Sequence, residues 1–252
     1  MAGANRYLDE VEKLLAHVRT QEANINTIAQ KAAAAIMGGH WVRLFGSGHS
    51  VLPVQDCFPR YGGYPGFFPI MDPRLMWTAV SGPGGAEELL WLERQEGYMG
   101  NFLRHNVWHS KDVLVVISHG GQNAAPVEVA MAGKAQGLYV VALTSLDNHL
   151  NKPITHSSGK KIGDIADIIL DNGVTAEDAV VTVDGVGGKV GGTSTLIAIA
   201  MIQALVAETA TVLADNGYRV RPFASPNAQN VEAGRNVAVY VDYRERLQRS
   251  GG

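Results

Sequence analysis

Three short runs rich in glycine, serine and threonine are the segments best suited to carry chemistry. GSGHS occupies residues 46–50 and SHGGQN residues 118–123, each directly after an apolar run, and GGTST at 191–195 opens a long apolar stretch. Glycine lets the backbone approach a ligand closely, and small hydroxyl side chains donate hydrogen bonds without bulk. A tight turn with a serine cap explains any one of these runs equally well. Three of them together favour an anion site built from helix N-termini.

The donors in and near these runs are the candidate substrate-binding residues. Lys160, in the segment THSSGKK, can contact a phosphate group as a point charge, and His49 can hydrogen-bond a ligand hydroxyl. The candidate set is Ser47, His49, Ser50, Ser118, Gly121, Gln122, Asn123, Lys160, Thr193, Ser194 and Thr195.

Several carboxylates and one histidine are candidates for proton transfer, because both groups can serve as acid or base near neutral pH. Glu93 and Glu96 are one helical turn apart, which places them on one face of a predicted helix. Glu128 lies early in the helix predicted after the second run, and His156 stands in a polar turn among serines and lysines. The alternatives are structural: a solvated helix face for the first two, a favourable position in the helix dipole for Glu128, and a capping segment for His156.

The elements that must position these residues alternate along the chain. Helical spacing of apolar residues extends over 1–37, where a glycine pair ends it, and predicts an N-terminal helical extension. The strand-like runs are 41–45, 67–71, 113–117, 138–143 and 168–170, and the further helical stretches are 86–103, 124–136 and 193–214. This alternation predicts one α/β domain over 38–252, with a mostly parallel sheet covered by helices on both faces. The segment NVAVYVDYRERL near the end suits either a strand or a helix.

Nucleotide and metal sites are poorly supported. Gly46 and Gly48 begin a dinucleotide-binding pattern, but Val51 stands at its third glycine position. Around Lys189, a valine replaces the hydroxyl residue that a phosphate-binding P-loop requires. His105 and His109 have the spacing of zinc ligands on a helix, but no nearby cysteine or glutamate completes a set. The sequence therefore predicts no cofactor and no metal.

Composition bears on the partners and the compartment expected for the protein. The formal net charge of the 252 residues is −3 and the basic residues are scattered, which argues against a nucleic-acid partner. No uninterrupted run of eighteen apolar residues suggests a membrane span. Cys57 is the single cysteine, so no disulfide can form within the chain, and we expect a cytoplasmic protein.

These motifs resemble the SIS (sugar isomerase) domain, whose members bind phosphorylated sugars. Its first motif, a strand ending in Gly-Ser/Thr-Gly-x-Ser, is matched by residues 46–50, and its second by ISHGGQNAAPVEVAMAGKAQGLYVVALTS, residues 117–145. Two positions depart from the second motif: Gly120 replaces a serine, and Asn123 replaces a serine or threonine. The resemblance implies a three-layer, flavodoxin-like α/β/α sandwich around a five-stranded sheet. It also implies a homodimer or homotetramer, and we expect residues 1–37 at the interface.

A little-characterised branch of SIS proteins is the most similar, through the segments HSSGK (156–160) and ADIILDNG (166–173). The resemblance implies an aldose–ketose isomerase acting on a sugar phosphate, with Glu128 or Asp56 as base and His156 opening the ring. Glu93 is a further catalytic candidate, and Gln203, two turns past the TST start of its helix, a candidate sugar contact. Lyase cleavage, as in the N-acetylmuramic acid 6-phosphate etherases, is the first alternative. A non-catalytic phosphosugar sensor is the second, although residues 1–37 are too short for the DNA-binding domain that such sensors usually carry.

Overall fold

A five-stranded parallel sheet forms the centre of the protein. The computed structural model describes residues 2–76, 85–229 and 231–249. The strand order is β2-β1-β3-β4-β5, and every neighbouring pair runs parallel. The strands are mostly apolar because both faces of the sheet are buried, and Arg43 in β1 is the buried charged exception among β1, β2 and β3. They are β1 (Val42–Gly46), β2 (Phe67–Ile70), β3 (Val113–Ile117), β4 (Tyr139–Thr144) and β5 (Ile168–Asp171). The predicted fold class is confirmed.

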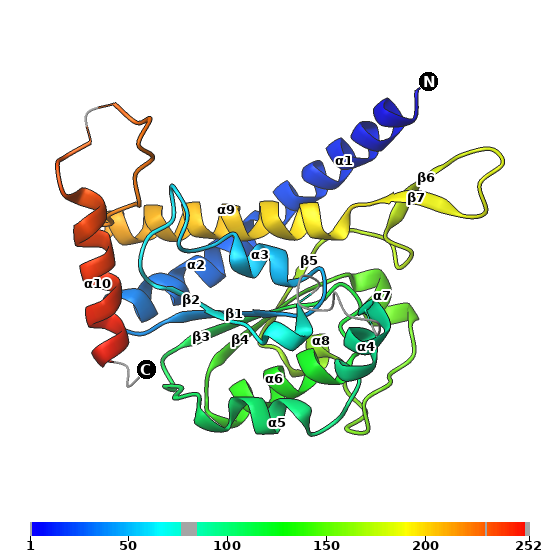
Figure 1. The fold of residues 1–252 in the computed structure, drawn as a ribbon, viewed down its shortest axis with the longest axis horizontal. Coiled ribbons are helices and arrows are strands. Elements are labelled where there is room, and N and C mark those ends of the chain that lie inside the picture. Colours follow the sequence, from blue (N-terminus) through cyan, green and yellow to red (C-terminus); the bar gives the residue numbers. More distant parts are fainter. Residues whose placement is uncertain (1, 77–84, 230, 250–252) are drawn as a thin grey trace.

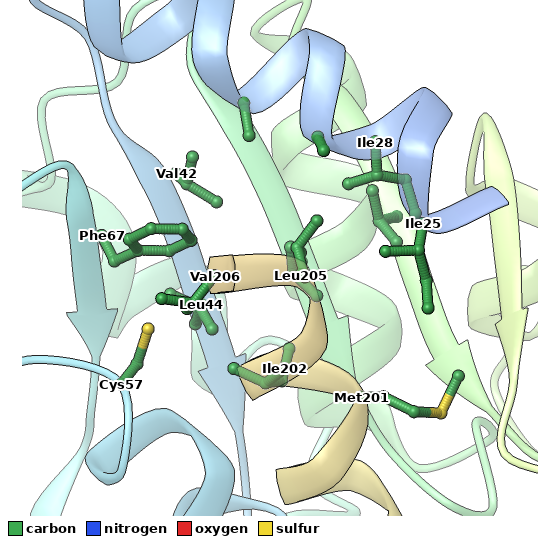
Figure 2. Close-up of a cluster of buried hydrophobic side chains, with 14 of the residues drawn as sticks. Ile25, Ile28, Val42, Leu44, Cys57, Phe67, Met201, Ile202, Leu205 and Val206 are labelled. Atoms are coloured by element: carbon green, nitrogen blue, oxygen red, sulfur yellow. The ribbon is translucent and has the colours of Figure 1, made fainter. Parts of the chain in front are cut away.

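Helices cover both faces of the sheet and make a three-layer sandwich (Figure 1). On one face lie α2 (Glu22–Met37), α3 (Val51–Gln55) and α9 (Ser194–Asp215), and α2 and α9 pack against each other. Figure 2 shows Ile202 and Leu205 of α9 packed toward Leu44 of β1. On the other face lie α5 (Tyr98–Phe102) and α6 (Ala124–Ala135).

The N-terminal segment is two helices rather than the continuous helix expected over 1–37. α1 (Gly3–Thr20) ends at Gln21, and α2 then begins and contributes Ile25 and Ile28 to the core. α1 extends beyond the sheet, beside a hairpin that the sequence reading missed (Figure 1). The hairpin joins β6 (Ala179–Thr182) and β7 (Lys189–Gly192), and these short, largely exposed strands lack the apolar runs that marked the sheet.

The helix expected over 86–103 is broken, which changes the placement of the two glutamates in it. α4 (Gly85–Leu92) stops before Glu93, and Gly97, with φ +85°, separates it from α5 and the 3-10 turn Leu103–His105. Glu93 and Glu96 thus lie in a turn and do not share a helix face. Asp56, one of the predicted bases, is the C-cap of α3, a helix of only five residues.

The remaining connections complete the layers. The ambiguous C-terminal segment is helical. Val239 is buried and Tyr243 packs against Trp41 and Phe58, whereas Val237, Tyr240 and Val241 are exposed. The elements not yet named are the 3-10 turn η1 (Pro73–Leu75), α7 (Leu146–Asn151), α8 (Ile162–Ile165) and this C-terminal helix, α10 (Arg235–Arg249).

Among the described residues, α9 is the one helix that by length and composition could cross a membrane. A search for uninterrupted apolar runs did not reveal it, because Thr195, Gln203 and Glu208 interrupt the pattern. Half of its most apolar window is buried inside the protein (50%), where it packs against α2 and the sheet. The helix is therefore accounted for as a core element.

Candidate functional site

The candidate site lies where the strand order reverses, at the carboxyl ends of β1 and β3. The chain passes from β1 to β2 on one side and then returns past β1 to β3 on its other side. Gly46 is paired with Ile117 at the ends of the two central strands. Ligands of open α/β sheets bind in the crevice at this kind of switch point. The fold brings the runs 46–50 and 118–123 together there.

The first loop is a tight turn that only glycine permits at its start. A Cβ on Gly46 would meet the carbonyl oxygen of Ser50 at 2.0 Å, so the chain folds back directly onto this residue. The amide of Ser50 donates to the Ser47 carbonyl (3.0 Å) and that of Gly48 to Leu75 (2.8 Å). These amides are therefore engaged, and the loop offers a ligand the half-buried Ser50 hydroxyl and the exposed His49 ring. The Ser50 hydroxyl has no hydrogen-bond partner within the described part of the chain.

Glu93 joins the two loops. Its Oε2 accepts a hydrogen bond from Ser47 Oγ (2.9 Å), and its Oε1 accepts one from Asn123 Nδ2 (2.6 Å). Its carbonyl accepts the amide of Ala125 in the first turn of α6 (2.9 Å). Burial raises the pKa of the Glu93 carboxyl, and the hydrogen bonds from Ser47 and Asn123 oppose that shift. The result is a buried carboxylate of enhanced basicity at the switch point.

The second loop is shaped by Gly121. This residue has φ +66°, and a Cβ on it would meet Thr144 Oγ1 at 2.9 Å, so a larger side chain is excluded. Its amide donates to Ser118 Oγ (3.1 Å). The carbonyl of Gln122 accepts the Thr155 hydroxyl (2.8 Å), and Gln122 Oε1 is buried without a partner among the described residues. The loop thus supplies amide and hydroxyl groups next to Glu93.

His156 lies between two carboxylates. Its Nε2 is 3.9 Å from both Glu96 and Glu128, while its Nδ1 accepts the amide of Ser158 (3.1 Å). Glu128 is committed elsewhere, because its oxygens accept the amides of Gly97 and Met99 (3.0 Å for Met99). Hydrogen bonds from the amide and hydroxyl of Ser157 lower the pKa of Glu96.

A cavity of about 260 Å³ adjoins this histidine. Its walls are formed by the second loop with the start of α6, by the turn after α4, and by the segment that carries His156. The lining residues are Arg94, Glu96, Gln122, Asn123, Ala124, Thr155 and His156. Asn123 lines this cavity together with His156 and also donates to Glu93, so it links the cavity to the buried glutamate.

The third run, at the start of α9, has an internal anion. The Asp178 carboxylate accepts the amides of Thr193 (2.9 Å) and Ser194 (2.7 Å), and also the Ser194 hydroxyl (3.0 Å). A protein carboxylate thereby occupies the donors expected to hold a phosphate. Thr195 is half-buried beside them, and its hydroxyl makes no hydrogen bond within the described part of the chain. A substrate role for these three residues stays a prediction.

Asp56 and Gln203 lie together on the α9 face of the sheet. Gln203 Nε2 donates to the Asp56 carbonyl (2.7 Å) and to its carboxylate (3.0 Å), and Arg60 forms an ion pair with the same carboxylate (2.5 Å). The contacts tie the end of α3 to the middle of α9. Lys160 is exposed, and among the described residues it forms no hydrogen bond or ion pair that would place it at the loops.

Comparison with known proteins identifies the family. The family model described as the SIS domain matches residues 6–145. The chain belongs to the SIS domain family. A UPF0309 protein of Halalkalibacterium halodurans is 33% identical over 242 residues, covering 96% of this chain and 94% of that one. Another UPF0309 protein, of Geobacillus kaustophilus, is 32% identical over 244 residues, covering 96% and 95%.

The fold has a solved relative. The structure of phosphoheptose isomerase from Neisseria gonorrhoeae superposes with a TM-score of 0.53 at 15% identity, covering 82% of this chain and 97% of that one. The likeness shows a shared fold. SIS members bind sugar phosphates, and the two loops of this chain stand at the strand ends of that fold.

Two residues of this SIS domain were missed in the sequence reading. His119, between Ser118 and Gly120, is enclosed by Asn148 and Asn172, whose Nδ2 atoms lie 3.1 and 3.4 Å from its ring nitrogens. Burial lowers the pKa of His119, an effect that the nearby Asp178 opposes. Its position inside the second run was the available signal.

The other missed residue is Lys161, the neighbour of the predicted Lys160. Lys161 is buried, and its Nζ donates to the carbonyls of Asn148 (2.9 Å) and His149 (2.7 Å) at the end of α7. Burial lowers the pKa of its ammonium group. It therefore anchors α7 against the polar turn, and nothing in the sequence distinguishes it from the lysine before it.

Proposed function

We propose that this SIS protein is an enzyme that interconverts the aldose and ketose forms of a sugar phosphate, with Glu93 as the base. The observation that carries the proposal is the position of the Glu93 carboxylate. It is buried, its pKa is raised, and it is held between Ser47 of the first loop and Asn123 of the second. A carboxylate whose pKa is raised toward neutrality is well suited to remove a proton from carbon.

The phosphate group binds at the two loops. The Ser50 hydroxyl, the His49 ring and the polar groups of residues 118–123 are the donors at this edge of the sheet. The N-terminus of α6, where Asn123 makes no side-chain cap, adds a favourable potential for an anion. Gly46 and Gly121 keep the backbone close to the bound group.

The reaction moves one proton between adjacent carbons. Glu93 takes the proton from C2 of the open-chain aldose while the C1 oxygen gains a proton, which gives an enediol. Glu93 then returns its proton to C1 while the C2 oxygen loses one, which gives the ketose. His156 is the candidate for opening the sugar ring, because it lines a cavity together with Asn123, whose amide donates to Glu93. Glu128 acts as a positioning residue, since it holds the backbone of Gly97 and Met99.

The geometry favours Glu93 over the other carboxylates expected from the sequence. Asp56 is engaged by Arg60 and Gln203 at the end of α3, and Glu128 by backbone amides. Glu93 alone among these candidates contacts residues of both loops. The solved relative with this fold is named a phosphoheptose isomerase, which supports isomerisation over cleavage as the reaction to test first.

A panel of sugar phosphates tests the proposal. Each compound is incubated with the protein in deuterated water, and the C1 and C2 protons are followed by NMR. We expect one aldose–ketose pair to interconvert with incorporation of solvent deuterium. Release of a substituent without interconversion would indicate the lyase alternative, and tight binding without exchange would indicate a sensor; either outcome contradicts the isomerase.

We further propose that the protein is a cytoplasmic homodimer or homotetramer and that α1 contributes to the interface. α1 extends beyond the sheet and exposes Leu8 (55%) and Leu15 (39%) along its length, which a second copy would cover (Figure 1). Cys57 is buried and free, as expected in a reducing compartment. Light scattering at micromolar concentration tests the assembly, and a monomer would contradict it.

A further inference from the structure

Three arginines line one cavity at the far end of α9 from the candidate site. Arg219 and Arg221 lie on the segment that follows α9, and Arg235 is the first residue of α10. They surround a cavity of about 280 Å³ to which Glu232 is the one acidic lining residue. Figure 1 shows α10 and this segment at the opposite end of α9 from the β6–β7 hairpin.

The charge in this cavity is not balanced by the protein. Elsewhere in the chain Arg43, Arg60 and Arg74 each have an aspartate oxygen within 3.0 Å. Within the described residues, none of the three cavity arginines has a carboxylate at 4.0 Å or less. Three guanidinium groups and one glutamate leave a net positive cavity, in which mutual repulsion is relieved by a bound anion.

The arginines are held on an ordered framework. Asn236, in the first turn of α10, accepts the amide of Ala224 (2.8 Å) and donates to its carbonyl (2.9 Å). Arg235 Nε donates to the carbonyl of Pro222 (3.2 Å). These bonds fasten the segment carrying Arg221 to the start of α10. The first turn of α10 contains no acidic residue, so the helix dipole adds to the positive potential of the guanidinium groups.

We propose that this cavity is a second anion site that binds the phosphate group of a small phosphorylated molecule. Guanidinium groups match the oxygens of a phosphate through paired, charge-assisted hydrogen bonds. The volume suits a phosphate with a small organic part. The site is separate from the strand ends, because the 22 residues of α9 place about 33 Å between its two ends.

Arginine footprinting with phenylglyoxal tests the site locally. The full chain is labelled with and without inorganic phosphate at constant ionic strength, with acetate as the control anion, and the modified peptides are quantified by mass spectrometry. At a phosphate concentration ten times the dissociation constant, we expect labelling of Arg219, Arg221 and Arg235 to slow about tenfold. The exposed Arg19 and Arg104 are internal controls whose labelling stays unchanged.

Variants separate this site from the loops at the strand ends. The same protection from phenylglyoxal in Ser50→Ala protein would support an independent site. Phosphate should also raise the melting temperature of Ser50→Ala protein, and this rise should be lost when Arg221→Gln and Arg235→Gln are added. Adding Arg104→Gln instead should leave the shift unchanged. Equal labelling with phosphate and acetate would overturn the proposal. So would protection that rises with protein concentration in the absence of phosphate, since it would mean that a second copy covers the arginines.

Discussion

Ser47 Oγ donates a hydrogen bond to Glu93 Oε2 at 2.9 Å, and this contact connects two parts of the chain 46 residues apart. Ser47 stands at the end of β1, and Glu93 in the turn after α4. With Asn123 on the other oxygen, the bond fixes a buried carboxylate between the two loops of the strand ends. The proposed proton transfer by Glu93 depends on this arrangement.

Replacing Gly46 with alanine should abolish binding at the first loop. The new Cβ would lie 2.0 Å from the Ser50 carbonyl, and backbone cannot yield that far without opening the turn. We expect loss of measurable sugar-phosphate affinity by calorimetry. Gly100→Ala is the matched control, because a Cβ at Gly100 meets nothing within 4 Å. Unchanged affinity in Gly46→Ala would show that the ligand does not use this loop.

Ser50→Ala should weaken phosphate binding without unfolding the protein. A hydrogen bond to a charged group contributes roughly 1.5–3 kcal/mol, so the dissociation constant should rise roughly 10- to 150-fold. Ser110→Ala, at an exposed serine just before the amino end of β3, should leave it unchanged. Equal affinities of Ser50→Ala and native protein would remove this hydroxyl from the site.

Asp178 caps α9, so its removal should cost stability. Asp178→Ala leaves the amides of Thr193 and Ser194 without their acceptor and places alanine at φ +66°. We expect a loss of about 1–2 kcal/mol in the free energy of unfolding, measured in urea. Asp178→Asn retains an acceptor and tolerates the backbone angle, so it should lose less. An alanine variant as stable as the native protein would contradict the capping role.

His119 should make stability depend on pH. Its folded pKa lies below the ordinary 6.5, so the unfolded chain binds more protons between the two values. The free energy of unfolding should therefore fall as pH drops below 6.5, and His119→Gln should lack this part of the decline. Denaturation of both proteins across the pH range provides the comparison. Parallel curves would show that burial of His119 does not disfavour its charged form.

The sheet could be predicted from the sequence because its strands are buried on both faces. Runs such as residues 113–117 are then continuously apolar, and the glycine-rich loops after them mark the strand ends. The direction of Glu93 could not be predicted, because it depends on the end of α4 at Leu92 and on a contact with Ser47, 46 residues earlier in the chain. The same holds for Asp178, whose left-handed backbone turns its carboxylate onto α9.

The central claim, that Glu93 is the base, is tested most directly by deuterium exchange at C2. The aldose phosphate that the native protein isomerises is incubated in deuterated water with Glu93→Gln, whose amide cannot accept the proton. We expect exchange and isomerisation to fall together by about 10²–10⁴-fold, with affinity for the sugar phosphate largely retained. Exchange at the native rate in Glu93→Gln protein would contradict the account.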